Sequence, residues 1–163
     1  MRPTREFLFR HPAHFLALGF GSGLASKAPG TFGTLAALPF FFLAHVVGGQ
    51  ATVLLVAAVF FVAGIWASEV TGKALGVSDH GSIVVDEIAA FLLVLAFAPL
   101  STAGVIVAFI LFRVFDIVKP WPISVADRRI KGGFGVMFDD LLAAIYAIIG
   151  LWVLRSILDG VRL

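Results

Sequence analysis

No cysteine occurs among the 163 residues, and charged residues make up only 13% of them. Without cysteine the chain can form no disulfide, no thiolate metal site and no cysteine nucleophile. The shortage of charge goes with 60% hydrophobic residues, whereas soluble domains are about 45–50% apolar and about 25% charged. One domain of this length has too little interior to bury so much apolar surface. The composition therefore predicts a protein of the lipid bilayer.

Other absences narrow the chemistry. No Gly-Lys-Ser or Gly-Lys-Thr occurs, which excludes a nucleotide-binding P-loop. No Asp-x-Asp occurs, which excludes the phosphatases that take their nucleophile from that motif. The basic first 14 residues are not followed by an apolar run with a small-residue cleavage site, so we expect no signal peptide. The net charge is only +2, and we expect no nucleic-acid partner.

Long runs without charge indicate the helices. Residues 28–68 carry no formal charge, which suits two membrane spans of roughly 20 residues each with a turn at Gly48-Gly49. Residues 88–112 are also uncharged and are interrupted by Pro99, which removes a backbone donor. Backbone groups in lipid must be satisfied internally, so these runs should be helical. We expect helices at residues 34–47, 52–75, 83–98, 102–118 and 136–158.

The predicted fold is all-α, a polytopic membrane bundle of about five membrane-depth helices. We expect one domain over residues 1–163, with a basic N-terminal arm at 1–20 and a helical core at 21–158. Three of the runs are shorter than roughly 20 residues, so some hairpins could be re-entrant. The glycine-rich stretches at 19–33 and 131–135 are expected to be loops beside polar motifs. The sequence gives no indication of oligomeric state.

If the chain crosses the membrane in alternate directions with successive helices, every charged motif lies on the same side of the membrane. By the positive-inside rule that side is cytoplasmic. Only Arg155, near the end of the last helix, and Arg162, beyond it, fall on the opposite side. The lysines and arginines expected on the cytoplasmic side are Arg2, Arg5, Arg10, Lys27, Lys73, Arg113, Lys119, Arg128, Arg129 and Lys131.

Acidic residues are few, and four of the ten form two adjacent pairs. Asp86-Glu87 and Asp139-Asp140 each precede an apolar run. Each pair could simply complement the positive end of a helix dipole. Two such pairs and Asp116 on one side favour a metal site instead, and oxygen ligands suit Mg²⁺. The lack of cysteine and scarcity of histidine argue against a dedicated zinc site.

Basic residues lie close to these carboxylates in the sequence. Arg113, Asp116 and Lys119 are spaced three apart, so all three can share a helix face. They form either an intrahelical ion pair or a cation site for phosphate beside a metal-binding carboxylate. The glycine-containing loop from Lys27 to Thr31 leads into a helix, whose backbone amides can bind phosphate. His80 follows Asp79, and it is either structural or a general acid/base.

Four polar runs resemble those of the phosphatidylglycerophosphatase A family. They are residues 30–37 (GTFGTLAA), 79–87 (DHGSIVVDE), 112–123 (FRVFDIVKPWPI) and 127–140, which holds Asp-Arg, Gly-Gly-Phe-Gly-Val-Met and Asp-Asp. The resemblance covers residues 21–144. It implies a Mg²⁺-dependent lipid phosphatase that hydrolyses phosphatidylglycerophosphate to phosphatidylglycerol and phosphate, in the bacterial inner membrane. The residues alone indicate only a cytoplasm-facing, metal-binding membrane protein with a phosphate ligand.

On this resemblance the site residues take three roles. The expected metal ligands are Asp86, Glu87, Asp139 and Asp140. The expected catalytic residues are His80, Asp86, Glu87, Asp116 and Asp139. The expected substrate-binding residues are Lys27, Gly30, Thr31, Arg113, Lys119, Asp127 and Arg128.

Two other enzyme classes fit less well. A CDP-alcohol phosphatidyltransferase motif is matched at Gly135 and Asp139, but residue 143 is alanine and the Asp-Gly start is missing. A histidine-dependent class of lipid phosphatases needs a second histidine beside His80, and none occurs nearby. Another Mg²⁺-dependent lipid-headgroup enzyme remains an alternative.

A non-enzymatic alternative is a membrane transporter with carboxylates along its path. Against it, no carboxylate lies mid-helix, either in residues 88–112 or in the last predicted span. The nearest candidate is Glu69, and Lys73 is placed four residues later to neutralise it.

Overall fold

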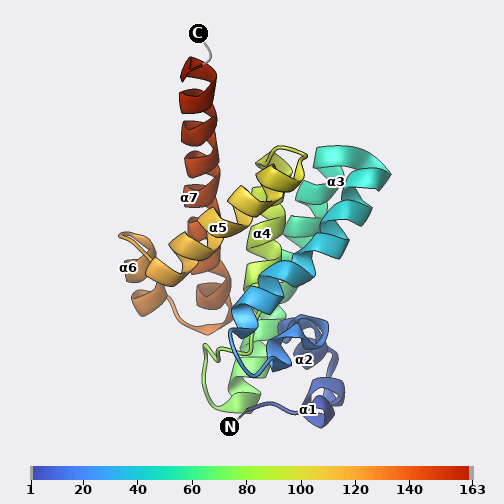
Figure 1. Ribbon diagram of the computed structural model, residues 1–163. Helices are drawn as coiled ribbons and strands as arrows, with labels where there is room; N and C mark the ends of the chain where they lie inside the picture. The colour runs from blue at the N-terminus through green and yellow to red at the C-terminus, as the bar shows by residue number, and fades with distance from the viewer. Residues whose placement is uncertain (1, 162–163) are drawn as a thin grey trace.

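A computed structural model describes residues 2–161, and every regular element within them is a helix (Figure 1). The elements are α1 (Arg5–Arg10), α2 (Pro12–Ala17), the 3₁₀ helix η1 (Gly19–Leu24), α3 (Pro29–Leu75), α4 (Val85–Phe97), α5 (Thr102–Val118), α6 (Ile123–Arg129) and α7 (Gly132–Val161). The all-α prediction is confirmed for this part of the chain. Arg162, expected beyond the last helix, lies outside the described residues.

Helix α3 is a hairpin of two arms, residues 29–47 and 50–75, as Figure 1 shows. The backbone leaves the helical region at Gly48 (φ −158°) and at Gly49 (φ 63°). Glycine adopts the second of these conformations without the steric cost of a Cβ. The turn predicted at Gly48-Gly49 is therefore confirmed, and the side chain of Gln50 ties it to the carbonyl of Ala96 at 3.0 Å.

Helix α4 lies at the centre of the bundle, between α3, α5 and α7 (Figure 1). Nine of its 13 residues are buried, including Phe91, which stacks on Phe112 of α5 with 5.7 Å between ring centroids. Burial of apolar side chains at roughly 25 cal/mol per Å² stabilises this packing. Ser101 caps α5 by accepting a hydrogen bond from the amide of Gly104 at 3.0 Å.

Helix α7 begins earlier than the sequence suggests. We expected a loop over residues 131–135 and a helix from 136, but the helix starts at Gly132. The difference comes from a tertiary contact, because Glu69 of α3 accepts a hydrogen bond from the amide of Gly133 at 2.7 Å. As a result Asp139-Asp140 lies two turns inside α7, whereas Asp86-Glu87 lies in the first turn of α4 as expected.

The N-terminal residues fold back on the second arm of α3. His14 is buried, stacks on Phe7 with 4.1 Å between ring centroids, and shares a hydrogen bond with the hydroxyl of Thr71 at 3.0 Å. The short helices α1, α2 and α6 were not predicted, since they lack the length that makes a periodic pattern visible.

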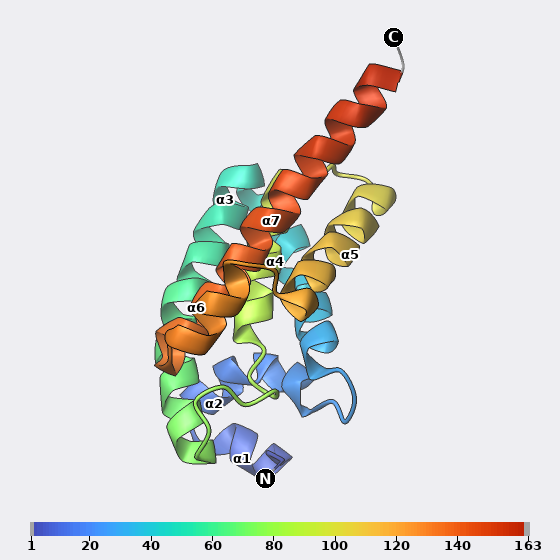
Figure 2. The same ribbon diagram turned by 90° about the vertical axis from the view of Figure 1, so that its left-hand side faces the viewer.

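The two ends of the molecule differ in what they carry. The turn of α3 and the α4–α5 connection lie at one end, and the C-terminal part of α7 projects beyond them (Figures 1 and 2). The α3–α4 loop, the N-terminal helices and the start of α7 lie toward the other end. Helices α3 and α7 are long and apolar enough to cross a membrane. Helices α4 and α5 have 13 and 17 residues, fewer than roughly 20, so five helices of membrane depth stay a prediction.

Candidate functional site

Three carboxylates meet where α4 and α7 come together. Asp86 and Glu87 from the first turn of α4 and Asp140 from α7 each offer an oxygen within 4.8 Å of the others. Asp86 and Asp140 are 8% and 3% exposed. One oxygen of each residue is buried without a hydrogen-bond partner: Asp86 Oδ1, Glu87 Oε2 and Asp140 Oδ2. Unpaired carboxylate oxygens away from water are costly, and a hard divalent cation with oxygen ligands would satisfy them. The donor set therefore fits Mg²⁺.

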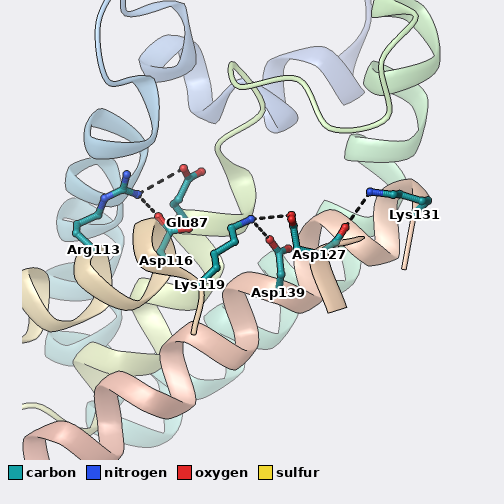
Figure 3. A network of polar contacts seen from close by, with 7 residues as sticks. All are labelled: Glu87, Arg113, Asp116, Lys119, Asp127, Lys131 and Asp139. Atoms are coloured by element: carbon teal, nitrogen blue, oxygen red, sulfur yellow. Dashed lines mark hydrogen bonds and ion pairs between the residues drawn. The ribbon is translucent and has the colours of Figure 1, made fainter. Parts of the chain in front are cut away.

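Arg113 of α5 joins this cluster to a fourth carboxylate (Figure 3). Its Nη1 lies 2.6 Å from Asp116 Oδ2 and 3.6 Å from Glu87 Oε1. The same nitrogen donates to the hydroxyl of Thr34 at 3.3 Å, and that hydroxyl donates to the carbonyl of Gly30 at 2.8 Å. Thr34 is fully buried, so the start of α3 holds the guanidinium in place.

Gly30 lies directly against Glu87 and Arg113. A Cβ at this position would lie 2.1 Å from Glu87 Oε1 and 3.1 Å from Arg113 Nη1. Only glycine fits so close an approach. Of the loop residues expected to bind phosphate, Gly30 therefore reaches the cluster, whereas Thr31 is half-buried and Lys27 is exposed to solvent.

A second group of charged side chains, the Lys119 centre, lies beside the carboxylate cluster and consists of Lys119, Asp127 and Asp139. The Nζ of Lys119 donates to Asp127 Oδ1 at 2.8 Å and to Asp139 (Figure 3). Burial lowers the pKa of Lys119, but its hydrogen bonds with the two carboxylates outweigh burial and raise the pKa above its ordinary value. The hydrogen bond from Lys119 lowers the pKa of Asp127 in turn. Lys119 is therefore positively charged and bound to two negative partners.

The geometry differs from the sequence prediction at two places. We expected Arg113 and Lys119 both to hold Asp116, but only Arg113 does, because α5 ends at Val118 and Lys119 turns away with φ 44°. We grouped Asp139 with Asp140, yet neighbouring residues point about 100° apart on a helix. Asp140 faces Asp86 and Glu87, whereas Asp139 faces Lys119.

The loop between α3 and α4 carries the remaining predicted residues. His80 is half-exposed, and its Nδ1 accepts a hydrogen bond from the amide of Ser82 at 3.2 Å. Asp79 lines a small polar cavity together with Asp127 and Asp139. This cavity lies beside the Lys119 centre. Arg128 lies on the exposed side of α6.

Two contributors were missed in the sequence. In the sequence Thr34 stands out only as a member of the run at residues 30–37, although a hydroxyl four residues after Gly30 can bond back to that carbonyl. Glu69 was correctly expected to pair with Lys73, and their side chains lie 2.8 Å apart. Its second contact, with Gly133 of α7, has no signal in the local sequence.

Comparison with known proteins identifies relatives over most of the chain. A family model described as Phosphatidylglycerophosphatase A matches residues 15–155. A Haemophilus influenzae protein named Phosphatidylglycerophosphatase A is 43% identical over 154 residues, 94% of each chain. An Escherichia coli protein of the same name is 42% identical over 136 residues, 83% of this chain and 78% of its own.

A third relative has a different name. A Bacteroides thetaiotaomicron protein, provisionally named a phosphatidylinositol-3-phosphatase, is 37% identical over 150 residues, 88% of this chain and 93% of its own. No solved structure matches the chain.

Proposed function

The chain belongs to the phosphatidylglycerophosphatase A family, and we propose that it hydrolyses phosphatidylglycerophosphate to phosphatidylglycerol and phosphate. The observation that carries this proposal is the cluster of Asp86, Glu87 and Asp140, each of which has a buried oxygen without a hydrogen-bond partner. Two basic side chains, Arg113 and Lys119, lie beside this cluster and are paired with carboxylates. A phosphate monoester carries the opposite charge to these cations, and the oxygen cluster suits the metal that such a reaction employs. The expected substrate is a lipid because the site belongs to a largely apolar bundle.

Asp86, Glu87 and Asp140 would hold Mg²⁺, whereas Asp139, which was also expected to be a ligand, would hold Lys119. When bound, Mg²⁺ supplies positive charge that offsets the phosphate oxygens and makes the phosphorus easier to attack. The three unpaired oxygen atoms support this assignment. Their distance from one another, at most 4.8 Å, supports it as well.

Arg113 and Lys119 would bind the phosphate group. Each is already held by carboxylates, which fixes its position before substrate arrives. Pre-positioned charges of this kind stabilise charge in a transition state without reorganisation. The backbone at Gly30 and Thr31, Lys27 and the exposed Arg128 would complete the phosphate site, with Asp127 holding Lys119.

The bond that breaks joins phosphorus to the glycerol oxygen. Asp116, fixed by Arg113 at 2.6 Å, would orient the attacking water and accept its proton. His80 would give a proton to the glycerol oxygen as it leaves, which requires the α3–α4 loop to bring His80 to the phosphate. In the rival mechanism an aspartate attacks phosphorus and forms a covalent intermediate.

The membrane arrangement is part of the proposal. Helices α3, α4, α5 and α7 would provide five membrane-depth segments, with the carboxylate cluster facing the cytoplasm in the bacterial inner membrane. The positions of the charged residues support this orientation. Glu69 is paired with Lys73 on the surface and contacts α7, so it does not favour a transporter.

Phosphate release by the purified protein tests the proposal. We would supply phosphatidylglycerophosphate and, in parallel, phosphatidylinositol 3-phosphate, each with Mg²⁺. The expected result is rapid release from the first lipid and at least about tenfold slower release from the second, since a headgroup site built for one ligand rejects another by unpaired polar contacts. Asp159→Asn, which changes an exposed carboxylate at the far end of α7, is the control variant. It should release phosphate from each lipid at the rate of the unaltered protein. Equal or reversed preference would overturn the substrate assignment.

A further inference from the structure

Glu69, on the second arm of α3, contacts the first turn of α7 from 64 residues away in the chain. Its Oε2 accepts a hydrogen bond from the amide of Gly133 at 2.7 Å. Amides in the first turn of a helix have no partner within that helix. A carboxylate at this end also complements the helix dipole. Glu69 therefore acts as a cap supplied by a neighbouring helix.

The contact is close because Gly133 has no side chain. A Cβ on Gly133 would lie 2.0 Å from the carbonyl oxygen of Ile65 and 2.7 Å from the amide nitrogen of Glu69. One turn further along α7, Met137 packs against Gly64, where a Cβ would lie 2.7 Å from the methionine. Helix α7 is thus docked on α3 at two successive turns.

The same docking determines where Asp140 points. Gly133, Met137 and Asp140 are spaced four and three apart, so they lie along one side of α7. A slip of one residue would rotate that side by about 100° and move it about 1.5 Å along the axis. Asp140 would then leave the group in which its oxygen lies within 4.8 Å of those of Asp86 and Glu87.

We propose that Glu69 is a positioning residue for the metal site, which it serves by fixing the rotation and height of α7 through the amide of Gly133. The inference rests on the proposed function, in which Asp86, Glu87 and Asp140 hold a divalent cation. Lys73 is not needed for this role, because its ion pair with Glu69 is at the surface, where its own side chain is 76% exposed, and exposed pairs contribute little.

Binding of Mn²⁺ to the purified protein without lipid, followed by electron paramagnetic resonance, tests the role independently of activity. Groups that hold metal ligands in place typically contribute about 10–100-fold to affinity, so Glu69→Ala should weaken Mn²⁺ binding about tenfold. Glu69→Gln keeps an acceptor oxygen for Gly133 and should stay within about twofold of the unaltered protein. Lys73→Ala is the matched control and should also stay within about twofold, as expected for loss of an exposed ion pair.

Two results would overturn the positioning role. One is unchanged Mn²⁺ binding by Glu69→Ala. The other is a loss in Lys73→Ala equal to that in Glu69→Ala, which would assign the effect to the ion pair. If Glu69→Ala does not fold, Glu69→Asp replaces it in the test. Its side chain is one methylene shorter, so Mn²⁺ binding should again be weaker than in the unaltered protein. Failure of the unaltered protein to bind Mn²⁺ would count against the proposed metal site itself, so the two failures are distinguishable.

Discussion

Lys119, the residue that follows α5, donates a hydrogen bond to Asp139 inside α7. Asp139 is 5% exposed, and Lys119 also binds Asp127. A buried carboxylate that loses its cation costs about 3–5 kcal/mol. Under the proposed function Lys119 would therefore have two separable tasks, to stabilise the site before substrate binds and to bind phosphate afterwards.

Lys119→Ala should lose about 100-fold or more of the rate of phosphate release, in line with the removal of a pre-positioned transition-state contact. It should also unfold at lower temperature, because Asp139 is left unpaired. The double variant Lys119→Ala/Asp139→Asn should recover much of the stability but not the rate. Lys131→Ala, which removes an exposed lysine near the same Asp127, is the control. Near-normal turnover in a folded Lys119→Ala protein would contradict the phosphate-binding role.

Gly30→Ala should damage the site without a change of charge. The added Cβ would lie 2.1 Å from Glu87 Oε1, so Glu87 and Arg113 must move apart or α3 must shift. We expect a loss of at least about tenfold in kcat, since small displacements of positioned groups can cost about 100-fold. Gly160→Ala, where nothing lies within 4 Å, should have the rate of the unaltered protein. Unchanged kcat in Gly30→Ala would show that this close approach has no functional role.

Thr34 offers a test of how Arg113 is held. Thr34→Val removes the hydroxyl that accepts from Arg113, and a hydrogen bond to a charged group contributes about 1.5–3 kcal/mol. Thr34→Ser keeps the hydroxyl and should retain most activity. The comparison is made on KM and kcat together with thermal unfolding. If the serine variant is as impaired as the valine variant, the hydroxyl is not what positions Arg113.

Membrane orientation can be tested with single cysteines, because the natural chain has none. Arg129→Cys, at the exposed end of α6, should react with a membrane-impermeant maleimide only from the cytoplasmic side. Asp159→Cys, in the exposed part of α7 beyond the bundle, should react only from the opposite side. Reaction of both from the same side would contradict a membrane crossing by α7, the helix that separates the two positions.

The sequence predicts the helices of the bundle well where charge-free runs meet glycine or proline. The turn at Gly48-Gly49 and the span of α5 agree with the structure. The predicted start of α7 was wrong, because Glu69 of α3 holds in helical form the glycines that suggested a loop. Local patterns carry no information on such long-range contacts.

The candidate site was predictable in residue type but not in pairing. Acidic and basic residues that are sparse in an apolar chain stand out, and eight of them meet in two neighbouring centres. Which carboxylate meets which cation depends on the rotation of α7 and on the backbone of Lys119 after α5 ends. Asp139 and Asp140 are neighbours in sequence yet belong to different centres, since a helix turns about 100° per residue.

The choice between water and an aspartate as nucleophile is testable in a single turnover in ¹⁸O-water with enzyme in excess. Direct attack by water places the label in released phosphate. A covalent phospho-aspartate hydrolysed at its acyl carbon places the label in the protein, and hydrolysis at phosphorus again labels phosphate. Rapid acid quenching with labelled substrate separates that last case, because it traps any phospho-enzyme. We expect labelled phosphate and no trapped intermediate, and a trapped phospho-aspartate would contradict attack by water.

The central claim is that Asp86, Glu87 and Asp140 hold the Mg²⁺ on which phosphate release depends. The most direct measurement is the rate of phosphate release from phosphatidylglycerophosphate as Mg²⁺ is titrated into metal-free protein, compared between the unaltered chain and Asp140→Asn. We expect no release without Mg²⁺, and for the variant either no activity or a half-maximal Mg²⁺ concentration raised by at least about tenfold, given that even groups supporting a ligand contribute about 10–100-fold. Full activity in the presence of a chelator, or superimposable titrations of the two proteins, would contradict the claim.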